Sequence, residues 1–382
     1  YGPFSGVLPP QISQAEAHGR LTSELLDSFL HGRTNCTLFA YGQTGSGKTY
    51  TLFGPPNCFA SDGAGPGLSP AGVALAAEGD FGLCPRAILD VRRAVLSGGA
   101  GDSTLFLSAV EVYLEECYDL LRNKVKVPIA GLGSVNKKAG GSFNNQQLGG
   151  PARDANGKWV PPILNGKRNP ACQQVEVQGC AEVDVLQDEG SLLHVMRVIE
   201  ANRSGRSHAL NERSSRSHCL VTLTMTRIAK DGQKTQTRFL FVDLAGSERI
   251  KKTDVLGLGV QEAKNINLSL SSLGRCISAL RKGGRDAFVP WRDSALTLLM
   301  RQSLSGNCRT ALCVCIAEDG AWAQETVSSL RFGITCGSLR TSACAVESSD
   351  AKGEASYLQA RLAELDAELA DLRAKGAHGH VD

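Results

Sequence analysis

The chain has 382 residues, of which 42% are hydrophobic and 21% are charged, so it is long enough for one large domain or two ordinary ones with a packed core. Its net charge of +3 does not by itself point to nucleic acid or a membrane surface as a partner. No apolar run approaches the about 20 residues that a membrane span needs. Because no signal peptide precedes them, the 13 scattered cysteines are expected to be reduced cytosolic thiols. A first residue other than methionine indicates a fragment.

In chain order, hydrophobic spacing predicts a helix over residues 21–30, a buried strand over 36–41 and a helix from Thr49 onward. Residues 103–121 are predicted to form a strand that runs into a helical turn. Residues 122–172, rich in Gly, Asn, Pro and Lys, predict a long surface insertion. A strand hairpin is expected over 173–185 and an amphipathic helix over 190–202.

The C-terminal half continues the alternation of strands and helices. Paired strands are predicted over 219–229 and 235–246, a helix over 264–280, a strand over 310–318 and a helix over 325–332. Strands interspersed with helices imply an α/β layered domain. Cys313 and Cys315 are expected to share one face of their strand, where structural thiols are favoured over a zinc site because no second pair stands nearby.

The tail has a different pattern. Leucines stand at positions 358, 362, 365, 369 and 372, with Glu, Asp and Arg between them. This spacing is typical of the seam of a coiled coil and predicts a coiled-coil start over 354–375 and a homodimer formed through it. About two heptads are marginal alone, so a solvated amphipathic helix lying on the domain is the alternative.

A glycine-rich segment follows the first predicted strand. Residues 42–49, GQTGSGKT, match the pattern G-x-x-x-x-G-K-[ST] in full. The glycines let backbone N–H groups turn toward phosphate oxygens, Lys48 supplies a charge for the β- and γ-phosphates, and Thr49 offers a hydroxyl to Mg²⁺. The following helix adds its positive end. The predicted nucleotide-binding residues are Gly42, Gln43, Thr44, Gly45, Ser46, Gly47, Lys48, Thr49 and Tyr50.

Two further polar segments suit the same chemistry. Asp243 ends an apolar strand in FLFVDLAGSE and is placed to hold Mg²⁺ through water, and Gly246 offers an amide to a γ-phosphate. The segment NERSSRSH, residues 211–218, is either a polar surface loop or a loop whose hydroxyls reach the γ-phosphate and Mg²⁺. These segments together predict a nucleotide that carries a γ-phosphate, bound with Mg²⁺; the family resemblance given below implies ATP.

The three segments in this order resemble the kinesin motor family, in which GQTGSGKT is the P-loop, N-x-x-S-S-R-S-H is switch I and DLAGSE is switch II. EVYLEECYDLL, EAKNINLSLSSLG, VPWRDSALT, SLSGN and ETVSSLRF also appear in the family's order. The resemblance covers about residues 1–339, apart from the insertion. It implies a P-loop NTPase kinesin motor fold, a central mixed β-sheet with helices on both faces, then a neck-linker-like segment over 340–353 and a short coiled-coil helix.

The resemblance also implies roles for individual residues. Arg216 and Glu248 are expected to form the latch that closes switch I on switch II, and Gly246 to sense the γ-phosphate. Ser215 joins Thr49 and Asp243 at Mg²⁺, and Asn211 and Ser217 hold the phosphate end. The helix from Lys264 onward is expected to face tubulin. The candidate basic residues at that surface are Lys251, Lys252, Lys264, Arg275 and Arg292.

The chain departs from the family pattern in several places. The family's first strand, with its adenine clamp, is missing. Leu268, Ala295 and Leu298 stand where the family has basic residues, which implies weaker microtubule binding unless the basic insertion compensates. The segment after Phe332 matches the family's neck linker poorly, which puts linker docking in doubt.

The leading functional hypothesis is a microtubule-stimulated ATPase that moves along microtubules, with plus-end direction inferred from a coil on the C-terminal side. The alternative is an immotile ATP-binding microtubule crosslinker or a structural cytoskeletal or axonemal component. A depolymerase and a P-loop enzyme unrelated to tubulin rank below these. The expected location is the cytoplasm, on the microtubule cytoskeleton, the cilium included. The expected partner is tubulin, with no nucleic acid and no membrane span.

Overall fold

The computed structural model describes most of the predicted globular domain and little of the tail. The described residues are 4–59, 80–98, 102–129, 152–153, 159–160, 177, 179–186, 189–204, 216–229, 233–248, 258–282 (backbone alone up to 267), 288–305, 308–339, 343 and 345–346.

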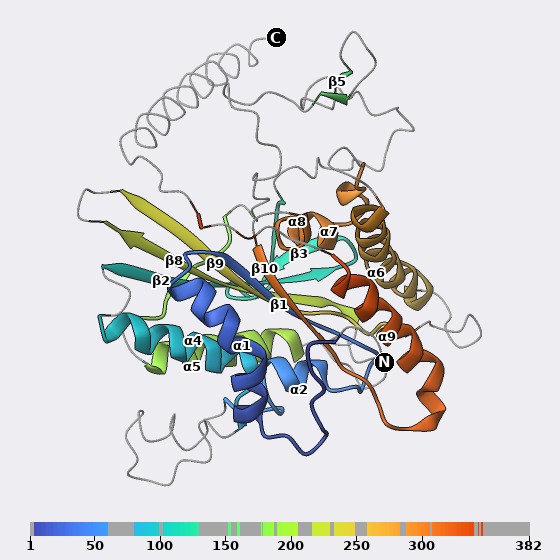
Figure 1. Cartoon of the computed structure of the whole chain (residues 1–382), viewed down its shortest axis with the longest axis horizontal. Coiled ribbons are helices and arrows are strands. Elements are labelled where there is room, and N and C mark those ends of the chain that lie inside the picture. Colours follow the sequence, from blue (N-terminus) through green and yellow to red (C-terminus); the bar gives the residue numbers. More distant parts are fainter. Residues whose placement is uncertain are drawn as a thin grey trace, which may run out of the picture.

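An eight-stranded sheet forms the centre of the fold (Figure 1), in the order β10-β1-β9-β8-β2-β3-β4, with β7 paired to β2. β1 runs parallel to both β10 and β9, and the remaining pairings are antiparallel. The predicted mixed sheet is therefore confirmed. The strands are β1 Asn35–Tyr41, β2 Ser103–Tyr113, β3 Glu116–Asp119, β4 Val125–Val127, β7 Val183–Asp184, β8 His218–Ile228, β9 Lys234–Asp243 and β10 Cys308–Val314.

Helices cover both faces of the sheet, as predicted (Figure 1). One face is covered by α1 Gln14–Leu30, α2 Lys48–Leu52, α4 Leu83–Leu96 and α5 Glu189–Ser204. The other is covered by α6 Leu258–Lys282, α7 Ala295–Leu299, α8 Arg301–Ser305 and α9 Ala323–Gly337, with the short 3-10 turns Trp291–Asp293 and Gly320–Trp322. None of the described helices is long and apolar enough to cross a membrane.

The core is densest around β1. All seven of its residues are buried, which is why its sequence is mostly apolar, with Asn35 and Thr37 as its buried polar side chains. On the α1 side, the ring of Phe239 lies 4.3 Å from that of Phe241 and 5.6 Å from that of Phe29, measured between centroids. These three rings join β9 to α1 and hold the central strands against the helical layer.

The structure corrects two of the predicted elements. Residues 116–119 form a strand, β3, and not a helical turn, because Leu114 and Glu115 take positive φ angles of 52° and 63° and reverse the chain into a hairpin with β2. The beginning of the predicted insertion also belongs to the sheet, since β4 pairs with β3. The separate pair β5 Ala152–Arg153 and β6 Trp159–Val160 lies within the rest of that insertion.

The predicted hairpin over 173–185 pairs elsewhere in the part that is described. Val177 bridges to Ile129, and β7 pairs with β2. The remaining predicted elements up to α9 are confirmed in type, with α2 limited to five residues.

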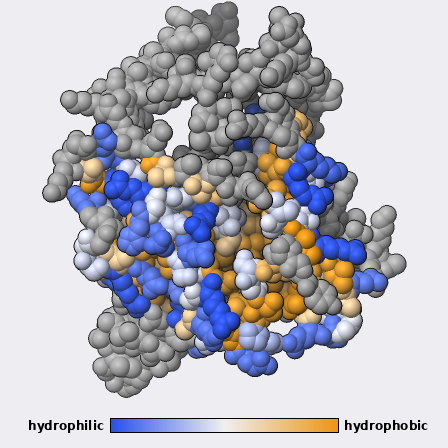
Figure 2. Space-filling view, viewed as in Figure 1, coloured by the Kyte–Doolittle hydropathy of each residue, from blue (hydrophilic) through white to orange (hydrophobic). Residues whose placement is uncertain are grey.

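The outer edge at β10 carries exposed apolar side chains. β10 pairs with β1 on one side only, and no strand precedes α1 among the described residues. Figure 2 shows hydrophobic residues gathered over the region of β10 and α9, where Ile316, Val327 and Ile334 are 44%, 45% and 38% exposed. The predicted lack of the family's first strand, and the domain boundaries, stay predictions. The predicted coiled coil over 354–375 lies outside the described residues, as does most of 340–353.

Replacing Phe239 with alanine tests the packing of the sheet on α1. Because this fully buried ring contacts two others, Phe239→Ala is expected to lower the free energy of unfolding by about 3–5 kcal/mol. Denaturant unfolding measures the loss. Leu96→Ala, at a side chain that is 59% exposed, is the control and is expected to change stability by about 0.5 kcal/mol or less. Equal losses in the two variants would contradict this assignment of the core.

Candidate functional site

The phosphate loop, residues 42–49, connects β1 to α2. Gly47 caps α2 with a φ of 93°, in the left-handed region that favours glycine. A Cβ on Gly42 would collide with the carbonyl oxygen of Cys315 at the end of β10. At Gly45 and Gly47 a Cβ would meet none of the described atoms within 4 Å, so the loop is packed against the sheet behind it and open in front. This is the geometry that an approaching phosphate requires.

Within the loop, two side chains donate hydrogen bonds to the carbonyl oxygen of Gln43. It accepts hydrogen bonds of 2.8 Å from both Lys48 Nζ and Ser46 Oγ. Lys48 is only 7% exposed, and burial lowers its pKa while Asp243 and Glu248 oppose that shift. The lysine is thus held at the base of the loop near two acidic side chains, where its ammonium group could bind an anion.

Asp243 lies beside the loop because β9 is parallel to β1, with Asp243 opposite Ala40. Its Oδ2 accepts a 2.6 Å hydrogen bond from Thr49 Oγ1 and forms a 2.9 Å ion pair with Arg203 Nη1. Its buried Oδ1 has no hydrogen-bond partner among the described residues. An orphaned carboxylate oxygen next to a threonine hydroxyl is the oxygen chemistry that Mg²⁺ prefers, so these residues fit the predicted ion.

Sequence reasoning missed Arg203. This α5 residue is 6% exposed, and its guanidinium lies 5.6 Å from the centre of the Phe53 ring. A buried arginine must be paired with an acid, but its place beside Asp243 depends on α5 packing under the sheet. No pattern in the sequence around Arg203 predicts that contact.

The 244–248 loop is hydrogen-bonded directly to the phosphate loop. Ser247 N donates to Gly42 O over 3.1 Å, and Glu248 accepts from Thr44 N at 2.8 Å and from Thr44 Oγ1 at 2.5 Å. A Cβ on Gly246 would collide with Thr44 Oγ1 and both carboxylate oxygens of Glu248. A side chain at position 246 would therefore have to displace the side chains of Thr44 and Glu248 that join the two loops.

The third predicted segment is described only from Arg216 onward, so Asn211 and Ser215 lie outside the described residues. Ser217 is fully buried, and its hydroxyl donates to Glu111 Oε1 over 2.8 Å. Glu111 in turn lies 2.9 Å from Lys124 Nζ in a buried ion pair. Ser217 thus anchors the end of its segment to β2 in this structure, where a phosphate contact was expected. The latch between Arg216 and Glu248 stays a prediction, since the described hydrogen bonds to Glu248 come from Thr44.

His218 is a second residue whose role the sequence analysis missed. Its Nδ1 accepts from Ala245 N over 3.0 Å, and its Nε2 lies 2.8 Å from Ser269 Oγ in α6. Burial, with Lys48 and Arg203 nearby, lowers its pKa from 6.5 to about 3. The ring is therefore neutral at physiological pH, and the amide that donates to Nδ1 places the proton on Nε2.

The candidate microtubule-binding residues are only partly described. Lys251 and Lys252 lie outside the described residues, and so does the side chain of Lys264. Arg292 is exposed, and Arg275 forms a half-exposed 2.9 Å ion pair with Asp293. Of the three positions that lack the family's basic residues, Leu268 is 37% exposed, but Ala295 and Leu298 are buried. The last two therefore contribute to the core in this chain, which corrects the expectation that they face a partner.

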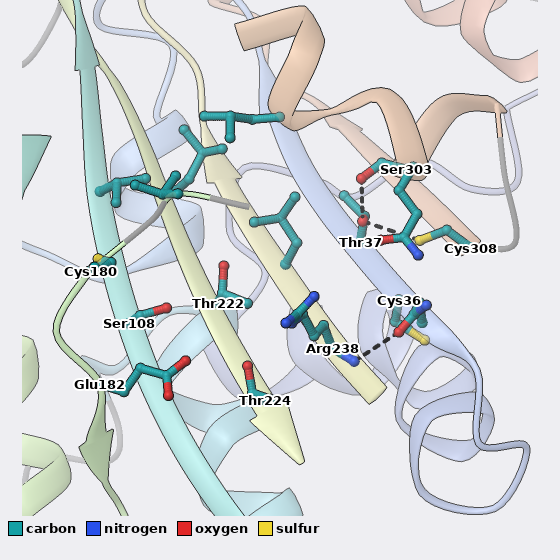
Figure 3. A pocket seen from close by; sticks show the side chains of 18 residues that line it. Cys36, Thr37, Ser108, Cys180, Glu182, Thr222, Thr224, Arg238, Ser303 and Cys308 are labelled. Carbon is teal, nitrogen blue, oxygen red and sulfur yellow. Dashed lines mark hydrogen bonds between the residues drawn. The ribbon is translucent and has the colours of Figure 1, made fainter. Parts of the chain in front are cut away.

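Described residues line cavities at both ends of the central strands. The larger, about 460 Å³, lies at the opposite end of β1 from the phosphate loop, where Thr37, Ser303 and Cys308 point toward one another (Figure 3). None of residues 42–47, the part of the phosphate loop that precedes α2, lines this cavity. The smaller, about 350 Å³, adjoins α2 and is lined by Thr49, Tyr50, apolar side chains and Arg203. The candidate site is thus next to the smaller cavity.

Two of the cysteines lie close together at the end of β10. Cys313 and Cys315 lie with their sulfur atoms 3.9 Å apart, and the described part of the chain has no group of three or more His, Cys, Asp or Glu side chains able to hold a metal. The eleven described cysteines are free thiols.

The buried neutral His218 predicts an acid-dependent loss of stability. Its folded pKa is depressed, so its contribution is complete above the unfolded value of 6.5 and is lost as pH falls toward 3. Between pH 6.5 and 5, the difference in unfolding free energy between the wild type and His218→Gln is expected to shrink by about 1–2 kcal/mol. Denaturant unfolding at each pH measures it, with His31→Gln, at an exposed histidine, as control. A pH-independent difference would contradict the buried neutral ring.

Comparison with known proteins agrees with this geometry. A family model, the kinesin motor domain, matches residues 3–338. Kinesin-related protein 5 of Dictyostelium discoideum is 32% identical over 88% of this chain and 29% of its own length, and Kinesin-like protein KLP1 of Chlamydomonas reinhardtii is 32% identical over 96% and 40%. The chain thus spans less than half the length of these relatives.

A solved structure shares the fold. It is described as the structure of a fast kinesin, with implications for ATPase mechanism and interactions with microtubules, and it matches with a TM-score of 0.68 and 29% identity. The match covers 91% of this chain and 83% of that one. With a family model over nearly the whole described domain and a phosphate loop bonded to its DLAGSE loop, this chain belongs to the kinesin motor domain family.

Proposed function

We propose that this chain is a microtubule-stimulated ATPase that converts ATP hydrolysis into movement along microtubules. The observation that carries the proposal is the direct hydrogen bonding between the phosphate loop and the 244–248 loop. A phosphate bound at the first loop would compete for Thr44 and Gly246 and so displace Glu248. Nucleotide chemistry would thereby change the conformation of a loop that leads toward α6.

The described side chains suit distinct parts of ATP hydrolysis. Lys48 and the amides of residues 44–49 would bind the phosphates, and Thr49 with Asp243 would hold Mg²⁺, whose charge offsets that of the phosphate oxygens. Glu248 and Arg216 would close the site and order the attacking water, as in the latch expected from the family resemblance. Since such chemistry consists mainly of positioning and charge stabilisation, each of these residues acts by holding a group in place.

The expected partner surface is the outer side of α6 and the turn before α7. Arg275 and Arg292 supply described basic side chains there, and Lys251, Lys252 and Lys264 are proposed to add to them. An acidic tubulin surface would be attracted by this charge. The location that follows is the microtubule cytoskeleton.

We also propose an amino-terminal, plus-end-directed motor that dimerises through residues 354–375. The support is the leucine spacing of that segment, which places a coil on the C-terminal side of the motor domain. Movement of polarity-marked microtubules in a gliding assay tests the direction, and sedimentation of the chain with and without these residues tests the dimer.

The alternative is an immotile, ATP-binding microtubule crosslinker. The exposed Leu268 and the atypical segment after Phe332 favour it. Steady gliding driven by ATP would exclude this alternative, whereas nucleotide-insensitive crosslinking of microtubules without gliding would exclude the motor.

The proposed function predicts a hydrolysis rate that rises with microtubule concentration and then saturates. Phosphate release is measured with the purified chain, with and without taxol-stabilised microtubules, at constant low ionic strength because the expected contacts are electrostatic. A hydrolysis rate that does not change with microtubule concentration would contradict the proposed function. A chain that does not bind ATP would contradict the assignment of the nucleotide site.

Glu248→Ala is predicted to bind ATP but to stall turnover. The variant removes the acid expected to close the site, so microtubule-stimulated turnover should fall about 100-fold or more while nucleotide affinity is retained. Binding of a fluorescent ATP analogue and phosphate release measure the two properties. Glu318→Ala, at an exposed acid, is the control; normal turnover in Glu248→Ala would show that the latch is wrongly assigned.

A further inference from the structure

Beyond the phosphate site, a single buried side chain connects three separate elements. His218 begins β8, accepts a hydrogen bond from Ala245 N in the 244–248 loop, and contacts Ser269 Oγ in α6. The ring is 3% exposed and Ser269 is 2% exposed, so solvent does not compete for either contact. The ring is also far from Ser269 in sequence, which means that only the tertiary fold creates this junction.

The loop that His218 holds is the same loop that the phosphate site holds. On one side of Ala245 stands Asp243, bonded to Thr49, and on the other stand Ser247 and Glu248, bonded to Gly42 and Thr44. A shift of this loop therefore changes the position of the Ala245 amide. Because a buried acceptor without its donor is costly, the imidazole is expected to follow the amide.

The two ring nitrogens have complementary roles. With Nδ1 accepting from Ala245, the neutral ring carries its proton on Nε2 and donates to Ser269. The imidazole ring is rigid, so a displacement of Nδ1 also displaces Nε2. Ser269 stands between Leu268, which is exposed, and Leu270, which is buried in the core beneath α6.

We propose that His218 is a positioning residue that couples the 244–248 loop to α6, so that the hydrogen bond to Ser269 makes the position of α6 depend on the nucleotide. The consequence for microtubule affinity rests on the function proposed above, but the coupling itself does not. The competing route is apolar: Leu244 and Ala245 belong to the same buried hydrophobic cluster as Leu273 and Ile277 of α6, and a Ser269 variant changes none of these side chains.

The test is the effect of Ser269→Ala on nucleotide-dependent hydrogen exchange in α6. Exchange of the amides of residues 268–282 is measured in the full chain with Mg²⁺ and either ADP or a non-hydrolysable ATP analogue, without microtubules. In the wild type the two states are expected to differ in exchange rate. In Ser269→Ala the ratio of the two rates is expected to fall about fivefold, within the usual range of coupling between sites.

Matched variants separate coupling from general loosening of the helix. Ser271→Ala is the control, because this exposed hydroxyl bonds only back to Leu268 O of its own helix among the described contacts, and its ratio should equal that of the wild type. Should Ser269→Ala fail to fold, Ser269→Cys keeps the side-chain size with a weaker acceptor and should lower the ratio by less. An unchanged ratio in the Ser269 variants, or equal exchange in both states of the wild type, would overturn the inference.

A second readout separates this inference from the proposed function. The ratio of microtubule Kd values with ADP and with the ATP analogue should fall in Ser269→Ala in parallel with the exchange ratio. If exchange responds as expected but microtubule affinity ignores the nucleotide in the wild type, the coupling stands and the motor function fails.

Discussion

The parallel pairing of β1 with β9 is the constraint on which the rest of the site depends. This pairing sets Ala40 opposite Asp243, so both strands end at the same edge of the sheet. The phosphate loop and the 244–248 loop, which follow these strands, therefore begin side by side. Hydrogen bonds from Thr49 to Asp243, Ser247 to Gly42 and Thr44 to Glu248 then join the two loops. Because β1 is buried along its whole length, this edge cannot shift without disturbing the core.

β8, which runs antiparallel to β9, begins at the edge of the sheet where β9 ends. Cys219 of β8 pairs with Asp243, which places His218 against the 244–248 loop and beneath α6. On the opposite face, Arg203 of α5 reaches the same aspartate. The carboxylate is thereby held by Thr49 of α2 and Arg203 of α5, which lie on the same face of the sheet, and one of its oxygens has no partner among the described residues. Hydrogen bonds give Thr49, Asp243 and Glu248 defined positions, while Gln43 Oε1 and Arg203 Nε, like Asp243 Oδ1, are buried without a hydrogen-bond partner among the described residues.

Two departures from the family pattern lie in the core of the domain. Ala295 and Leu298 replace basic residues of the family pattern and are buried with α7 against α6, so they add apolar contact where the family places charge. The site at the edge of β1 does not depend on them. The packing of α7 against α6 and the geometry of the sheet edge therefore involve different residues.

The sequence alone determined the phosphate loop, the strand before it, the acidic residue after β9 and the order of strands and helices, because these depend on local spacing and on glycine at positions that no other residue can occupy. Only the tertiary structure decided that Ser217 anchors to Glu111, that Glu248 contacts Thr44, that Arg203 pairs with Asp243 and that His218 joins three elements. These four contacts join residues distant in the chain, and the free energy that selects them comes from burial in the shared core. The β2–β3 hairpin is local but also escaped prediction, because its turn has positive φ angles at Leu114 and Glu115, which are not glycines.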